Sequence, residues 1–343
     1  MAAGPLNPEP KEATVRVFGF TIAIKYLSLL CLVVQNSSLV LTMRYSRTTE
    51  GPMFLSSTAV VLSELLKMVC ATFLLCAEDR FNWTLLKTRI RREVLDVPTD
   101  MLKLSIPSIL YTIQNNLQYV AVSHLDAATF QVTYQLKILT TALFSVVMLQ
   151  RTLDKTKWLS LLILTLGVAL VQLPPGTFSS ASSPSALAAT SAPESDAETA
   201  QSPLIGLIAV LTACLLSGFA GVYFEKILKG SPVSLWTRNI QLGFYGTLIG
   251  LLVVYLQDGE RVEANGFFYG YQFMTLVVIL NQAMGGLLVA VVVKYADNIL
   301  KGYATSISII ISCVFSVFFF GFEITTLFVF GSSLVMYAVY LYS

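Results

Sequence analysis

Residues 203–224 read PLIGLIAVLTACLLSGFAGVYF, and none of them is charged. A helix needs about 20 mostly apolar residues to cross the hydrocarbon core of a bilayer, so this run predicts a membrane-spanning helix. The rest of the chain has the same character. Of its 343 residues 55% are hydrophobic and only 12% are charged, and its mean hydropathy is +0.72. Because soluble domains carry about 25% charged residues, the composition argues against a soluble enzyme.

The net charge and the cysteine positions argue against further classes of protein. The formal net charge is +2, from 22 basic and 20 acidic residues, so the sequence predicts no surface for nucleic acid. The cysteines lie in apolar stretches without C-x-x-C spacing, at Cys31, Cys70, Cys76, Cys214 and Cys313. We interpret them as packing side chains and predict no zinc site, no other metal site and no disulfide framework.

Ten segments of the chain are long and apolar enough to be candidate spanning helices. They are residues 21–43, 53–77, 101–123, 126–149, 156–173, 203–225, 235–256, 271–293, 298–320 and 324–342. Several of them contain Gly, Pro, Asn or Gln, which a helix that lines a cavity can use but a lipid-facing helix cannot. The sequence therefore predicts an all-α polytopic membrane protein with ten transmembrane helices around a polar interior.

The distribution of basic residues predicts the orientation of these helices. Most Lys and Arg residues outside the segments fall on the side of the N-terminus, above all in residues 78–100, whereas Arg44, Arg47 and Arg261 fall on the other side. By the positive-inside rule both termini are expected in the cytosol. The first apolar segment has no small-residue cleavage site after it, so we interpret it as a retained helix.

The chain divides into two halves at a low-complexity segment. Residues 174–202 are rich in Ser, Ala, Thr and Pro and contain neither Lys nor Arg, which predicts a flexible lumenal linker. An offset of 171 aligns Asp126 with Asp297, and Phe144-Ser145-Val146 with Phe315-Ser316-Val317. We predict a first five-helix repeat over residues 1–173 and a second over 203–343. An odd number of helices in each half inverts the second repeat, which is an architecture of secondary transporters.

Lysines inside the candidate helices are the first functional candidates, because a charge in hydrocarbon costs about 2.5–3.5 kcal/mol on insertion scales. Lys67 has Glu64 one turn earlier, so an internal ion pair and ligand binding are both open for it. Lys137 has no acidic residue three or four positions away, which favours a functional role. Lys294 and Lys301 lie near a membrane interface, where long side chains can extend to water.

Neutral hydrogen-bonding side chains greatly outnumber acidic ones in these helices. They include Gln114, Asn115, Asn116, Gln131, Tyr134, Gln135, Ser217, Tyr223, Asn239, Gln241, Asn281 and Gln282. Cations together with neutral donors predict an anionic substrate with a large polar surface, such as phosphates joined to a sugar or nucleoside. The alternative for any single amide is a structural bond between helices, worth about 0.6 kcal/mol.

The residues that catalysis needs are missing from the sequence. The single histidine, His124, lies at the end of a candidate helix beside Asp126, and we interpret it as a turn residue. There is no H-E-x-x-H, G-x-S-x-G or P-loop motif, and no acidic cluster in a loop. The sequence therefore predicts a protein that is not an enzyme and has no cofactor.

Long blocks of the sequence resemble nucleotide-sugar transporters of the Golgi, a family within the drug/metabolite transporter superfamily. The blocks are YTIQNN at 111–116, DAATFQVTYQLK at 126–137, SGFAGVYFEK at 217–226 and KYADNILKG at 294–302. The resemblance covers nearly the whole chain. It implies ten helices in two inverted five-helix repeats, and exchange of a nucleotide sugar for the nucleoside monophosphate that glycosyl transfer leaves behind.

The resemblance also implies a set of binding residues. Positions that line the nucleotide site of the related CMP-sialic acid transporter match Lys67, Tyr111, Asn115, Lys137, Ser217, Asn239 and Lys294. Two positions depart from that relative, since Gly243 and Phe130 each stand where it has a Tyr. These departures resemble the UDP-sugar branch, in which we expect Gly243 to open the wall that faces the base. Gln282, with the glycines Gly285 and Gly286, is the expected region of sugar choice.

Within the UDP-sugar branch, residues 114–121 and 280–291 are most similar to UDP-galactose transporters, while residues 41–47 are more similar to the UDP-N-acetylglucosamine branch. We expect import of UDP-galactose into the Golgi lumen in exchange for UMP. UDP-N-acetylglucosamine, or both sugars, is the alternative. A membrane scaffold that binds glycosyltransferases without transport is the alternative from another class. Expected partners are the UDP-sugar, UMP and the bilayer, and the candidate protein partners are Golgi glycosyltransferases or a second copy of the chain.

Overall fold

The structure is a computed structural model that describes residues 14–17, 20–96, 98–173, 202–229, 233–295 and 298–342. The side chains of residues 14–17, 20–26, 95, 228–229, 290–295, 298–303 and 305 also lie outside what it describes. The predicted linker is therefore outside the description except for Ser202, and so is the predicted repeat position Asp297.

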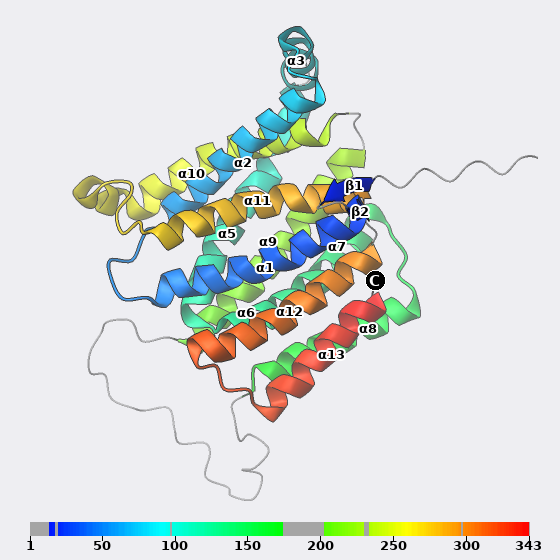
Figure 1. Ribbon diagram of the computed structural model, residues 1–343, viewed down its shortest axis with the longest axis vertical. Helices are drawn as coiled ribbons and strands as arrows, with labels where there is room; N and C mark the ends of the chain where they lie inside the picture. Colours follow the sequence, from blue (N-terminus) through cyan, green and yellow to red (C-terminus); the bar gives the residue numbers. More distant parts are fainter. Residues whose placement is uncertain are drawn as a thin grey trace, which may run out of the picture.

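Helices make up nearly all of the described chain (Figure 1). They are α1 (Ile24–Thr48), α2 (Ser56–Glu78), α3 (Trp83–Ile90), α4 (Pro98–Lys103), α5 (Ser105–His124), α6 (Ala127–Thr133), α7 (Lys137–Leu149), α8 (Lys155–Val171), α9 (Pro203–Lys229), α10 (Leu235–Asn265), α11 (Phe273–Tyr295), α12 (Asn298–Phe320) and α13 (Thr326–Tyr342). A π-helical turn, η1, covers Arg91–Leu95, and a 3-10 turn, η2, covers Tyr134–Leu136.

Each of the ten predicted segments coincides with helix, with three differences. Residues 20–23 belong to a short strand, β2 (Phe20–Ala23), which pairs antiparallel with β1 (Thr14–Val17), so the hairpin departs from the all-α prediction. The predicted fourth helix is divided into α6 and α7 by the 3-10 turn η2, just before Lys137. Residues 83–103 contain α3, η1 and α4, which the hydropathy pattern did not predict because they are too polar to span. Helix α4 takes residues 101–103 of the predicted third segment, and Leu104 separates it from α5.

Among the described residues, five helices are long and apolar enough to cross a membrane by length and composition. They are Leu27–Thr48, Ser56–Glu78, Ala127–Leu149, Pro203–Ile227 and Leu235–Asn265. Shorter apolar helices cover Phe273–Val289, Ser306–Phe320 and Thr326–Tyr342. The fold is therefore that of a polytopic membrane protein.

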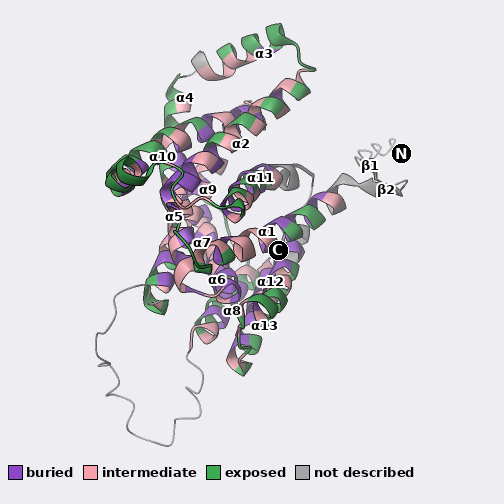
Figure 2. Cartoon of the chain, turned by 60° about the vertical axis from the view of Figure 1, so that its left-hand side comes forward, coloured by how far each residue is buried: buried purple, intermediate pink, exposed green. Residues whose placement is uncertain are grey.

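The distribution of polar and apolar side chains is that of a protein in lipid. Glu64, Arg238 and Gln241 are buried in the bundle, at 5%, 0% and 2% exposure. Large apolar side chains point outward instead, with Phe318 exposed by 80% and Tyr255 by 76%, and exposed positions recur along the outer helices (Figure 2). Since water disfavours such an apolar surface, these faces fit contact with acyl chains.

The most extensive helix contacts join the first half of the chain to the second (Figure 1). Five helices of the first half each pack against helices of the second half. The pairs are α1 with α11 and α12, α2 with α10 and α11, α5 with α9 and α10, α7 with α9, and α8 with α13. Close approach depends on glycine at two crossings. A Cβ on Gly218 of α9 would lie 2.4 Å from Oγ1 of Thr140 in α7, and a Cβ on Gly167 of α8 would lie 2.8 Å from the carbonyl oxygen of Gly331 in α13. The two halves therefore interleave and share one core.

Candidate functional site

Lys67 and Glu64 form a buried ion pair where α2 meets α10 and α11. The Lys67 Nζ lies 2.6 Å from the Glu64 Oε2, and the two side chains are exposed by 15% and 7%. A Cβ on Gly246 of α10 would lie 2.7 Å from that Oε2, and a Cβ on Gly286 of α11 would lie 3.1 Å from the Lys67 Cδ. The two glycines therefore leave the room that the pair occupies.

Tyr134, in η2, is the centre of a second polar group. Its hydroxyl accepts hydrogen bonds from the Nε2 atoms of Gln114 and Gln118 of α5, at 2.9 and 3.1 Å. Ser217 of α9 lies beside the same hydroxyl. The ring stacks on Phe130, with centroids 5.5 Å apart. These contacts hold the tyrosine ring in one orientation between α5 and α9.

Lys137 contacts the face of this ring. Its Nζ lies 4.5 Å from the centroid of the Tyr134 ring, which is the geometry of a cation–π interaction. Lys137 is also the first residue of α7, so the 3-10 turn sets the direction in which its side chain leaves the helix. A 3-10 turn inside a longer helix often marks a functional region.

Helix α5 joins the two groups, because it packs against both α9 and α10. A Cβ on Gly221 of α9 would lie 3.9 Å from the Tyr111 hydroxyl, so Tyr111 faces α9. Asn115 is one turn further along the same face and has no side-chain partner among the described residues. Asn239 of α10 donates to the Leu235 carbonyl oxygen at 2.9 Å and is 7% exposed.

Gln282 of α11 is hydrogen-bonded to α5. Its Oε1 accepts a hydrogen bond from the Tyr119 hydroxyl of α5 at 3.2 Å. The two glycines that we expected beside the sugar face protein side chains instead. A Cβ on Gly285 would lie 2.3 Å from Nε2 of Gln35, and Gly286 faces Lys67. In this conformation both glycines serve helix packing.

Gly243 of α10 lies against α2 in this conformation. A Cβ at this position would lie 2.8 Å from the Cβ of Met68 and 3.1 Å from the carbonyl oxygen of Glu64. The residue is thus enclosed at the crossing of α10 and α2, and a tyrosine side chain would collide with the α2 backbone region. In this conformation a neighbouring helix occupies the space of the missing side chain, and the expectation that Gly243 opens a wall facing the base stays a prediction.

Lys294 lies in the last turn of α11, but its side chain is outside the described residues. Apart from Gln282, the other predicted residues fall into two groups linked by α5. Lys67 lies in the first group, with Gly243 and Asn239 on the adjoining α10. Tyr111, Lys137 and Ser217 lie in the second, with Asn115 next to them on α5.

One cluster was not predicted from the sequence. Phe54 packs edge-to-face on Tyr119 and on Tyr271, with centroids 5.9 and 6.1 Å away, and the Arg47 guanidinium lies 5.1 Å from its ring. The Tyr271 and Thr58 hydroxyls are 3.0 Å apart. Burial raises the pKa of Tyr271 to about 12, while the bond to Thr58 acts in the opposite direction. No sequence spacing relates these residues, which come from separate segments.

Comparison with known proteins identifies the class. The profile of the nucleotide-sugar transporter family matches residues 20–343. The UDP-galactose translocator of Bos taurus is 52% identical over 343 residues, which cover 100% of this chain and 82% of that protein. The UDP-N-acetylglucosamine transporter of Homo sapiens is 54% identical over 322 residues, covering 93% of this chain and 95% of that protein.

The matched family and these relatives are transporters and not enzymes. The match extends over nearly all of the sequence, so it includes both polar groups and the helices that carry them. The chain belongs to the nucleotide-sugar transporter family.

Proposed function

We propose that the chain is an antiporter that imports UDP-galactose into the Golgi lumen in exchange for UMP by alternating access. The observation that carries the proposal is the 52% identity to a UDP-galactose translocator over the full length of this chain. The buried cations support an anionic substrate, since charged groups inside a bundle are costly unless a ligand or partner uses them.

Helix bounds support the two inverted repeats. The offset of 171 residues that relates the sequence motifs carries Ala127–Leu149, the span of α6 to α7, onto Asn298–Phe320, which is α12. The same offset carries α8 (Lys155–Val171) onto α13 (Thr326–Tyr342). Helices of equal length at a constant offset are what an internal repeat predicts.

Helix packing supports the same proposal independently. Each helix of the first half can be assigned a counterpart in the second half. If every helix is replaced by its counterpart, each major contact becomes another observed contact. The counterparts are α1 and α9, α2 and α10, α5 and α11, α6 with α7 and α12, and α8 and α13. The α1–α11 contact becomes α9–α5, α1–α12 becomes α9–α7, and α2–α11 becomes α10–α5. The pairs α2–α10 and α8–α13 map onto themselves. A two-fold relation between halves of five helices, all ten of them spanning, accounts for this pattern.

The proposed binding path follows α5, between the two polar groups. Lys137 and Lys294 are assigned to the diphosphate, and Lys67, Tyr111, Asn115, Ser217 and Asn239 to the nucleotide. Asn115 supports this assignment because its amide has no partner among the described residues, whereas Asn239 and Gln282 have bonds that a ligand must share or replace. Both termini are placed in the cytosol by the positive-inside rule.

A second substrate, UDP-N-acetylglucosamine, is favoured by a specific observation. The transporters with that name are 54% identical to this chain, slightly more than the UDP-galactose translocators, although they cover 93% of it. The two sugars differ at the acetamido group and in one hydroxyl configuration, so a few side chains decide between them.

Reconstitution tests the proposal. We would load proteoliposomes with UMP and offer radiolabelled UDP-galactose, UDP-N-acetylglucosamine and CMP-sialic acid in parallel. The expected result is UMP-stimulated uptake of UDP-galactose well above that of CMP-sialic acid. Uptake of UDP-N-acetylglucosamine alone would support the exchange mechanism but refute UDP-galactose as the substrate. Absence of UMP-stimulated uptake of any nucleotide sugar would favour the non-transporting scaffold.

A further inference from the structure

The segment that follows α2 has one face bonded to the bundle. Leu86 of α3 is 6% exposed. Arg89 lies one turn later, and its Nη1 donates to the Asp79 Oδ1 at 2.7 Å while its Nε donates to the Glu93 Oε1 at 3.2 Å. The other Glu93 oxygen accepts a hydrogen bond from the Thr237 hydroxyl of α10 at 2.6 Å. These bonds fix the rotation of α3 and η1, so the opposite face has a defined outward direction.

The outward face begins with apolar side chains. Phe81, Trp83 and Leu85 are exposed by 58%, 77% and 56%. The Phe81 ring packs edge-to-face on Phe73, at 5.7 Å between centroids, and Phe73 is itself 62% exposed on the membrane-spanning candidate α2. The exposed aromatic surface therefore continues the lipid-facing surface of α2 beyond the end of that helix.

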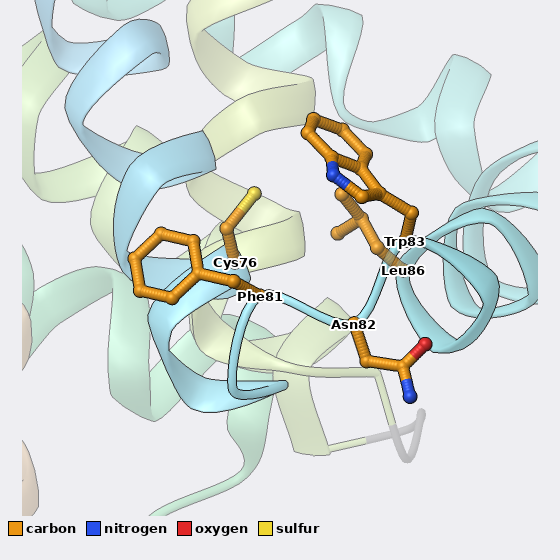
Figure 3. Close-up of a pocket in the computed structure, with 5 residues that line it drawn as sticks. All are labelled: Cys76, Phe81, Asn82, Trp83 and Leu86. Carbon is orange, nitrogen blue, oxygen red and sulfur yellow. The ribbon is translucent and has the colours of Figure 1, made fainter.

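Trp83 also bounds a shallow apolar cleft between the end of α2 and the start of α3. Cys76 and Phe81 lie on one side of it, and Trp83 and Leu86 on the other, with Asn82 between them (Figure 3). Helix α3 extends across the end of α2, with exposed residues along it (Figure 2). This is the arrangement of an amphipathic helix that lies in the plane of a membrane interface.

Exposed basic side chains adjoin the apolar ones. They are Arg80, Lys87, Arg91 and Arg92, and none of them forms an ion pair with the residues that the structure describes. The nearby acidic residues Glu78, Asp79 and Glu93 are all paired with Arg89 on the inner face. The outward face of the segment is thus positively charged, and it faces the side on which the positive-inside rule places the cytosol.

We propose that residues 80–92 form a binding surface for anionic phospholipid headgroups of the cytosolic leaflet. Phe81, Trp83 and Leu85 enter the boundary between headgroups and acyl chains, and Lys87, Arg91 and Arg92 bind the lipid phosphates and carboxylates. A polar segment without aromatics would favour a soluble anion, but exposed aromatic and basic side chains together in one short segment favour a lipid surface. The inference does not depend on which nucleotide sugar the protein carries.

Tryptophan fluorescence tests this surface directly. The chain has three tryptophans, so Trp158→Phe with Trp236→Phe leaves Trp83 as the only one. This full-length variant is reconstituted in phosphatidylcholine vesicles that contain an equal fraction of either brominated phosphatidylserine or brominated phosphatidylcholine. We expect both lipids to quench Trp83, and brominated phosphatidylserine to quench it about twofold more strongly because basic residues enrich anionic lipid locally.

Charge variants of the same protein sharpen the test. Lys87→Gln, Arg91→Gln and Arg92→Gln together should reduce the ratio of the two quenching values to about 1, as should high salt. Lys155→Gln is the matched control, since Lys155 is an exposed basic residue at the start of α8, and it should leave the ratio unchanged.

Three results would overturn the proposal. No quenching by either lipid would mean that Trp83 lies in water. Equal quenching by both lipids in the parent protein would exclude headgroup recognition, whether or not the triple variant folds. Loss of the phosphatidylserine preference on addition of UMP at constant ionic strength would assign the basic residues to soluble nucleotide.

Discussion

Lys67 and Lys137 are both lysines inside the bundle, and the structure surrounds them differently. Lys67 lies 2.6 Å from the carboxylate of Glu64 on its own helix, whereas the Nζ of Lys137 lies 4.5 Å from the centroid of the Tyr134 ring. A carboxylate neutralises a cation, but an aromatic ring stabilises the cation without removing its charge. We therefore expect Lys137 to attract a substrate phosphate as proposed, and Lys67 to share its charge with Glu64.

Replacing Lys137 should have the largest effect on transport. Lys137→Gln removes the charge and keeps much of the length, so the exchange of UDP-sugar for UMP should fall by roughly 10- to 100-fold, the loss expected for a hydrogen bond to a charged group. Lys155→Gln on the exposed start of α8 is the control and should leave exchange unchanged. Undiminished uptake by Lys137→Gln in proteoliposomes would remove the distinction between the two lysines.

Removing one partner of the Lys67–Glu64 ion pair should reduce the stability of the protein more than removing both. Glu64→Gln leaves a buried cation alone and should lower the free energy of unfolding by about 3–5 kcal/mol. The double variant Glu64→Gln with Lys67→Gln removes both charges and should recover much of this loss, as thermal unfolding in detergent would measure. If Lys67 also binds substrate, the double variant should be stable yet transport poorly. Full transport by a stable double variant would leave Lys67 with a structural role only.

A substitution at Gly243 tests how closely α10 packs against α2 beside the Lys67–Glu64 pair. Gly243→Ala places a Cβ 2.8 Å from the Cβ of Met68, so α10 and α2 must separate, and the free energy of unfolding should fall by about 1–3 kcal/mol. Gly259→Ala is a matched control on the same helix, because nothing lies within 4 Å of a Cβ there. Equal unfolding temperatures for the two variants would contradict the close helix crossing and restore the possibility of an open wall at Gly243.

The smallest effect is expected far from both lysines, at Tyr271. Tyr271→Phe removes the bond to Thr58 but keeps the ring against Phe54, so unfolding should become easier by only about 0.5–1.5 kcal/mol. Because the folded pKa is raised from 10.0 to about 12, folding favours the protonated phenol. Its contribution is therefore complete below pH 10 and is lost as the pH rises toward 12. The unfolding temperatures of the parent protein and of Tyr271→Phe between pH 7 and 12 would measure this contribution. If both proteins lost the same amount of stability as the pH rises, Tyr271 would be excluded as the source of the loss.

Much of the fold was predictable because it depends on a property read along the chain. Each of the ten apolar segments coincides with helix, and the offset of 171 found from two short motifs also relates the bounds of α8 and α13. The segment of α3 and η1 was not predicted, since α3 has only 8 residues and the contact of Glu93 in η1 with Thr237 joins positions 144 apart.

The candidate site was predicted as a set of residues but not as an arrangement. The sequence by itself determined that Lys137 has no acidic neighbour one turn away and that Lys67 has Glu64, because helical spacing fixes local neighbours. Only the tertiary structure decided that Gly243 is enclosed by α2, that Tyr119 bonds Gln282, and that Lys137 lies on the Tyr134 ring. The first two depend on which helices cross and how closely, and the third on the 3-10 turn that redirects α7. Helix crossings are set by the packing of the whole bundle, which no local pattern encodes.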